Sequence, residues 1–155
     1  MIEIRPSPTA DSRTCDHTKV TRQDLYNASL SHIGDVNNAL WFFSQLVLQA
    51  GARHDTDKLT DIAGFHRDFA KGFPDGDTPW WDAHRKLNRH HLNMADGVPE
   101  DVNLIDVLDY IADCVCAGMA RSGSVYEVVI DPEVLHRAFV NTIKRLKEEV
   151  VVVDA

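Results

Sequence analysis

The sequence has few cysteines and no long apolar run. Its three cysteines, Cys15, Cys114 and Cys116, are odd in number and show no CxxC spacing. This pattern predicts reduced thiols rather than a disulfide framework, as is typical of the cytoplasm. No apolar stretch approaches the roughly 18 residues that a membrane span needs, and the N-terminus has no signal-like apolar core. We therefore expect a soluble, cytoplasmic protein with no membrane partner.

Basic residues are also in the minority. The chain has 16 Lys and Arg against 24 Asp and Glu, a formal net charge of −8. Binding to a nucleic-acid backbone depends on basic residues that neutralise phosphates. The charge therefore argues against nucleic acid as the main partner. A small phosphorylated substrate stays compatible with it, because bound divalent ions would reverse the sign of the local field.

The chain length and its hydrophobic periodicity predict one all-α domain. With 155 residues it can bury a core without disulfides or a structural metal. A first long helix is expected to open at Thr21 and stop at Gly51, and a short one to follow a Thr60 cap. Later helix starts are expected at Thr78-Pro79 and at Asn103, and a turn at 73–77.

The sequence shows no internal repeat, no linker and no convincing strand pair, so we expect a helical bundle of about five to seven helices. Residues 1–20 read as an extended or partly disordered leader, residues 21–149 as the helical domain, and residues 150–155 as a C-terminal tail. The leader and the tail are candidate contact surfaces for a homo-oligomer.

The pair His54-Asp55 is the first candidate metal site. It places a neutral nitrogen ligand beside a carboxylate, and Lys58 follows at helical spacing from both. Neighbouring side chains on a helix diverge by about 100°, so the pair can hold one ion from two sides, or the aspartate can bridge two ions. A solitary His-Asp pair is usually part of a solvated turn. The hypothesis therefore depends on the histidines and the aspartate that accompany it.

His32 falls on the apolar stripe of the first helix, where a core histidine with a backbone partner is the alternative interpretation. His84 and His91 are seven residues apart, about 10.5 Å along a continuous helix, which is too far for one compact site. We therefore predict that the helix ends at Asn88, in a left-handed cap, so that His90 and His91 turn back toward the metal.

Asp113 lies among apolar residues of a late helix, where an aspartate needs a partner and a cation is a suitable one. Asp106 and Asp109 share its side, and a run of acids usually marks a solvated face. Arg85 and Arg89 alternate with the mid-chain histidines and are candidates for binding substrate phosphate. A solvated basic face is the alternative for both arginines.

Taken together, His32, His54-Asp55 and Asp113 stand in the ligand order of the HD-domain superfamily, which this sequence resembles. The additional mid-chain histidines and the HDxxK arrangement resemble the two-metal branches, among them the HD-GYP phosphodiesterases, although the GYP signature is missing. The sequence is more closely similar to a family of small HD-like proteins of bacteria and phages. That likeness is carried by HDTDKLT at 54–60, WxxHxxxNxHH at 81–91 and VLDYIADCVCAG at 107–118.

The resemblance implies one or two divalent metal ions, from among Mn, Fe, Co, Mg, Ni and Zn. It implies a metal-dependent phosphohydrolase that attacks a nucleotide or phosphate ester with a metal-activated water. A di-iron oxygenase of the same superfamily, or a non-catalytic metal- or nucleotide-binding module, are the alternatives. The implied metal ligands are His32, His54, Asp55, His84, His90, His91 and Asp113; the implied catalytic residues are Asp55 and Lys58; the implied substrate-binding residues are Lys58, Arg85 and Arg89.

Overall fold

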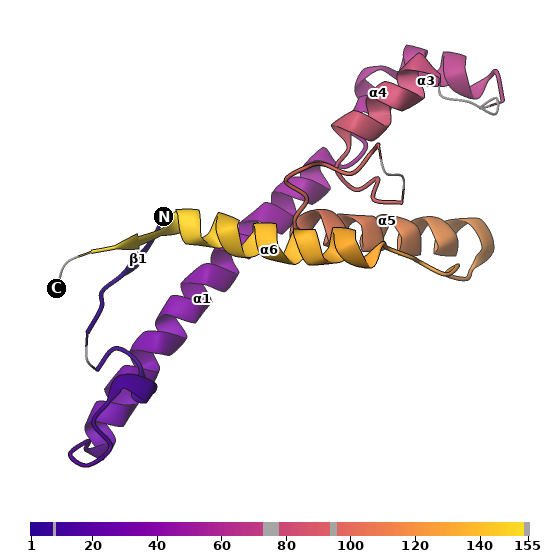
Figure 1. The fold of residues 1–155 in the computed structure, drawn as a ribbon. Coiled ribbons are helices and arrows are strands. Elements are labelled where there is room, and N and C mark those ends of the chain that lie inside the picture. Colours follow the sequence, from indigo (N-terminus) through magenta and orange to yellow (C-terminus); the bar gives the residue numbers. More distant parts are fainter. Residues whose placement is uncertain (8, 73–77, 94–95, 154–155) are drawn as a thin grey trace. The chain divides into compact units, whose positions relative to one another are not determined.

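The computed structural model describes the chain except residues 8, 73–77, 94–95 and 154–155, so the predicted turn at 73–77 lies outside the described residues. The structure is mostly helical, which confirms the all-α class. Figure 1 shows the elements in chain order: β1 (Ile2–Ile4), the 3-10 helix η1 (Ser12–Thr14), α1 (Arg22–Arg53), α2 (Thr56–Thr60), α3 (Ile62–Phe69), α4 (Pro79–Leu87), α5 (Leu104–Ser122), α6 (Pro132–Glu149) and β2 (Val150–Val152).

The chain divides into two compact units. Unit 1 contains Met1–Gln45 and Ile143–Ala155, and unit 2 contains Leu46–Thr142. Across the described residues of both units, no helix is both long enough and apolar enough to span a bilayer.

A short strand pair in unit 1 joins the two ends of the chain. β1 and β2 run parallel, with Ile2 opposite Val150 and Ile4 opposite Val152. The prediction that the sequence has no strand pair is therefore wrong at its ends. Isoleucine and valine are β-branched and favour extended backbone, and here the first residues of the predicted leader pair with the predicted tail.

The first long helix begins where the sequence predicts but ends later. The Asp24 backbone N–H donates to Thr21 Oγ1 at 3.2 Å, and the Thr21 N–H donates back to Asp24 Oδ2 at 2.9 Å, which forms the expected capping box. Gly51 does not stop the helix, because glycine inside a helix costs only about 1 kcal/mol. The hydrogen bond from His54 N to Ala50 O, 2.9 Å, carries the helical turn past it and up to the His-Asp pair.

The core of unit 2 lies between α5 and the first part of α6. Asn103 and Asp106 form the predicted capping box at the start of α5. The Leu104 backbone N–H donates to Thr142 Oγ1 at 2.8 Å, which ties this start to α6. Around this junction a cluster of apolar side chains is buried: Leu92, Val102, Val107, Tyr110, Cys114 and Ala138.

Helices α3 and α4 of unit 2 pack against each other. The Thr78 hydroxyl caps α4 by accepting from Trp81 N at 3.3 Å, as the sequence predicts. The predicted Thr60 cap of the preceding helix is wrong, because Thr60 ends α2 and Asp61 caps α3 instead. Asp61 Oδ1 accepts from the Gly64 backbone N–H at 3.0 Å. Asp61 directly precedes the first residue of α3, whereas Thr60 lies one residue further away.

The contact between α3 and α4 leaves no room for a side chain at Gly64. A Cβ there would lie 2.7 Å from Asp61 Cγ and 2.7 Å from Trp80 Cδ1. We expect Gly64→Ala to lower the free energy of unfolding by about 1–3 kcal/mol through overpacking. Gly51→Ala is the matched control, because nothing lies within 4 Å of its added Cβ. It should stabilise α1 by up to about 1 kcal/mol. Urea unfolding checks both, and equal destabilisation by the two changes would contradict the packing argument.

Candidate metal centre

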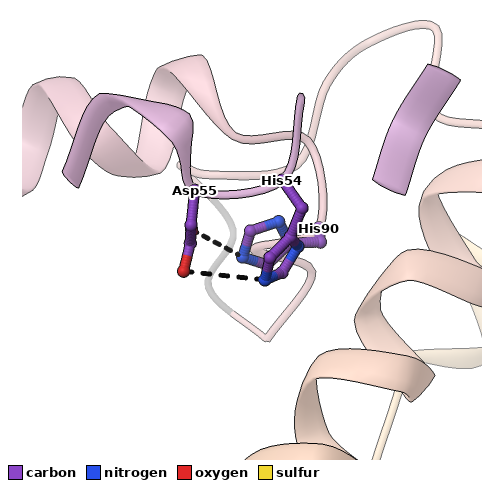
Figure 2. Close-up of side chains that lie close together, drawn as sticks. All are labelled: His54, Asp55 and His90. Carbon is purple, nitrogen blue, oxygen red and sulfur yellow. Dashed lines mark ion pairs between the residues drawn. The ribbon is translucent and has the colours of Figure 1, made fainter. Parts of the chain in front are cut away.

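The His-Asp pair lies at a sharp corner between α1 and α2. Asp55 precedes α2 with left-handed backbone dihedrals, φ 54 and ψ 19. Aspartate is among the few residues other than glycine that adopt this conformation readily. The Asp55 backbone N–H donates to Asn88 Oδ1 at 3.1 Å, which holds the corner against the end of α4. The corner thus directs the side chains of His54 and Asp55 toward His90, as Figure 2 shows.

Helix α4 ends at Leu87, so the predicted turn back after Asn88 is confirmed. Asn88 is extended, with φ −94 and ψ 111, and the predicted left-handed cap is wrong. The reason is that its side chain is engaged: Nδ2 donates to Asp57 Oδ1 at 2.9 Å and to His84 O at 3.0 Å. The turn brings His84 and His91 together, with 4.9 Å between their ring centroids.

Two groups of possible ligands share Asp55. We call His54, Asp55 and His90 subsite 1, and Asp55, His84 and His91 subsite 2; within each group, the candidate ligand atoms lie within 4.8 Å of one another. In subsite 1, His54 Nε2 is 3.6 Å from Asp55 Oδ2, and His90 Nε2 is 3.6 Å from Asp55 Oδ1 (Figure 2). In subsite 2, His84 Nε2 is 3.5 Å from Asp55 Oδ1.

Asp113 lies at the edge of subsite 1. Its Oδ1 is 3.8 Å from His54 Nε2, and its Oδ2 is 4.0 Å from His90 Nε2. Its side chain is 36% exposed, although the apolar residues around it in the sequence predict a more buried position. This carboxylate therefore borders solvent on one side and the histidines on the other.

Several polar atoms of the two subsites are buried without a hydrogen bond. Within the described residues, no partner is found for Asp55 Oδ1, His84 Nε2 or His91 Nε2. Buried polar groups in proteins are nearly always paired, and leaving one unpaired is costly. A cation bound by the carboxylate oxygen and imidazole lone pairs would satisfy all three atoms. These residues therefore fit a metal ion.

The charges of the site favour the ligating forms of these groups. Burial raises the pKa of Asp55, but the hydrogen bond and charge of Lys58, together with His54 and His84, outweigh burial and leave it lowered. Asp55 is therefore ionised. Burial, helped by the neighbouring His90 and His84, lowers the pKa of His91 to about 3, so this imidazole is neutral near pH 7.

Two further carboxylates, which the sequence analysis did not select, contact histidines of the site at Nδ1. Asp57 Oδ2 lies 2.7 Å from His84 Nδ1, and Asp109 Oδ1 lies 2.8 Å from His54 Nδ1. Burial raises the pKa of both carboxyl groups. At Asp57, hydrogen bonds from Asn88 and His84 more than offset burial. At Asp109, the nearby His90, whose Nδ1 is 3.6 Å away, and the hydrogen-bonded His54 do the same, so the pKa of both carboxyl groups is lowered. The available signal for Asp109 was its position one helical turn before Asp113.

Two tryptophans of α4 hold the His84 ring. Trp80 and Trp81 stack on it, with ring centroids 5.0 and 5.1 Å away. His84 is almost fully buried between them and the corner. Its orientation is thus set by packing on its faces and by Asp57 at its Nδ1.

The remaining predicted site residues belong to unit 1 or have other partners. His32 belongs to unit 1 and is exposed on α1, with Nδ1 3.4 Å from Asp11 Oδ2, so the expected burial of this face is wrong. Its role as a ligand stays a prediction. Arg85 Nη1 donates to Asp96 at 2.8 Å, and Arg89 Nε donates to Asp106 Oδ1 at 2.8 Å. Both guanidinium groups are thus engaged by carboxylates.

The lowered pKa of His91 predicts that the metal-free protein loses stability in mild acid. Below about pH 6.5 the unfolded chain protonates this imidazole, while the folded chain resists protonation down to about pH 3. Because the unfolded state then binds more protons, the free energy of unfolding falls as the pH falls through this window. The slope from one group is at most about 1.4 kcal/mol per pH unit, and smaller here because His91 is only partly buried.

Urea unfolding in the presence of a chelator, at about pH 7 and about pH 5, measures this loss. His91→Gln should show a smaller loss between the two pH values than the wild type. An unchanged difference would show that His91 is protonated in the folded chain as readily as in the unfolded one.

No family model, curated protein sequence or solved structure matches this chain. The resemblance to HD-domain proteins therefore remains an expectation from short motifs.

Proposed function

We propose that this chain is a metal-dependent phosphohydrolase that acts on a nucleotide or another phosphate ester. The main support is the buried Asp55 Oδ1, which has no hydrogen-bond partner among the described residues and lies 3.5 Å from His84 Nε2 and 3.6 Å from His90 Nε2. A carboxylate shared by two groups of ligands suits two ions held close together.

The types of ligand atom limit which metal ions suit the site. Imidazole nitrogens outnumber carboxylates, and such mixed sites suit Mn²⁺, Fe²⁺, Co²⁺, Ni²⁺ or Zn²⁺ better than Mg²⁺. Bound there, such ions would polarise a phosphoryl oxygen and lower the pKa of a bound water molecule toward about 7.

The protein residues supply orientation and charge. Asp55 Oδ1 faces histidines of both subsites, and Asp113 borders the solvent, where a substrate would approach. The Lys58 ammonium donates to Asp55 Oδ2. In the proposed reaction it balances charge on a phosphate oxygen or assists the leaving group. Lys58 is a better candidate for this role than Arg85 or Arg89, because its carboxylate partner, Asp55, belongs to both subsites. The carboxylate partners of the two arginines, Asp96 and Asp106, belong to neither.

The test is metal-dependent turnover of protein stripped with a chelator and then supplied with Mn²⁺, Co²⁺ or Fe²⁺. A panel of nucleotides, phosphomonoesters and phosphodiesters is assayed. We expect Asp55→Gly to lose the metal and to lower turnover by at least about 100-fold. Glycine tolerates the left-handed backbone at this position, so the change removes the carboxylate without straining the corner.

His66→Ala is the control, because His66 lies exposed on α3, outside both subsites. Its metal content and turnover should equal those of the wild type. Two tightly bound irons with visible absorption would favour the oxygenase alternative. Metal binding without turnover of any substrate in the panel would favour a binding module. Either result would overturn the hydrolase proposal.

A further inference from the structure

The two subsites differ in which carboxylate contacts their histidines. Asp57, on α2, contacts His84 of subsite 2. Asp109, on α5, contacts His54 of subsite 1 with Oδ1 at 2.8 Å, and its Oδ2 is 3.6 Å from Nδ1 of His90 in the same subsite. In both cases the carboxylate meets Nδ1, while Nε2 faces Asp55.

These contacts determine where the imidazole proton lies. An ionised carboxylate only accepts hydrogen bonds, so His84 Nδ1 and His54 Nδ1 must each carry a hydrogen. The Nε2 lone pair of each ring is then directed at the place where a metal would bind. The Nε2-protonated tautomer would direct an N–H at the cation instead.

Asn88 fixes the arrangement at subsite 2. Its Nδ2 lies 3.1 Å from His84 Nδ1, but its two hydrogens are directed to Asp57 Oδ1 and His84 O, at 2.9 and 3.0 Å. Asn88 therefore does not compete for the His84 nitrogen. It holds the Asp57 carboxylate so that Oδ2 meets His84.

We propose that Asp57 and Asp109 are positioning residues with separate targets. Asp57 sets the tautomer of His84 and thereby the metal affinity of subsite 2. Asp109 sets the tautomer of His54 and thereby the metal affinity of subsite 1. The part about affinity rests on the proposed metal centre. The part about tautomers concerns the metal-free chain alone. The two subsites can then be weakened one at a time, although they share Asp55.

Asparagine at either position is a nearly isosteric probe that replaces one acceptor oxygen by a donor. In Asp57→Asn the hydrogen bond from Asn88 keeps the amide oxygen at the Oδ1 position, so the new NH₂ faces His84 Nδ1 and moves the ring proton to Nε2. In Asp109→Asn the NH₂ faces either His54 or His90, and both belong to subsite 1. Asp82→Asn is the matched control, because Asp82 pairs with Lys86 and contacts neither subsite.

The first measurement is the tautomer of each histidine in the metal-free protein, from ring ¹⁵N chemical shifts at about pH 8. We expect Nδ1–H at His54 and His84 in the wild type. Asp57→Asn should convert His84 alone to Nε2–H, and Asp109→Asn should convert a histidine of subsite 1 and leave His84 unchanged. Wild-type His84 in the Nε2–H form, or variants that leave every tautomer unchanged, would overturn the proposal.

The second measurement is titration with Mn²⁺ alone. Asp57→Asn should weaken one of two binding events by about 10–100-fold, and Asp109→Asn should weaken the other by a similar factor. Equal weakening of both events by each variant would show a general structural role and overturn the separate assignment. If Asp55→Gly binds Mn²⁺ as the wild type does, the metal centre itself is wrong, while the tautomer results still decide the roles of Asp57 and Asp109.

Discussion

The Asp55 carboxylate is the constraint on which the rest of the candidate metal centre depends. Its oxygens face imidazole nitrogens from both sides, and its backbone occupies the left-handed corner between α1 and α2. Asn88 joins this corner to the end of α4 by accepting from the Asp55 backbone N–H. One residue thus combines a turn conformation with a ligand position, and an aspartate satisfies both requirements.

The residues around this carboxylate hold the neighbouring His84 ring in a fixed orientation. His84 is buried between Trp80 and Trp81, which fixes its ring plane, and the polar contact with Asp57 fixes its rotation within that plane. Such a shell costs stability when no cation is present, because buried lone pairs are left without partners. Proteins accept costs of this kind mainly at functional sites, where the surrounding structure holds the groups in place.

Much of the site could be predicted from the sequence because its residues are encoded locally. The pair His54-Asp55 is adjacent in the chain, and the end of α4 at Asn88 follows from the distance argument about His84 and His91. Asp57 and Asp109 could not be selected in the same way, since their role depends on distant histidines that fold against them. The strand pair at the chain ends, with partners almost a full chain length apart, was equally inaccessible to a search for local patterns.

This strand pair also bears on the order in which the chain folds. Ile2 and Val150 can meet only after nearly the whole chain has been brought into a loop, and the entropic cost of closing a loop grows with its length. Pairing of only three residues in each strand offsets little of that entropic cost. Pairing of β1 with β2 is therefore expected to be among the last contacts to form and among the first to open, while the locally stabilised helices persist.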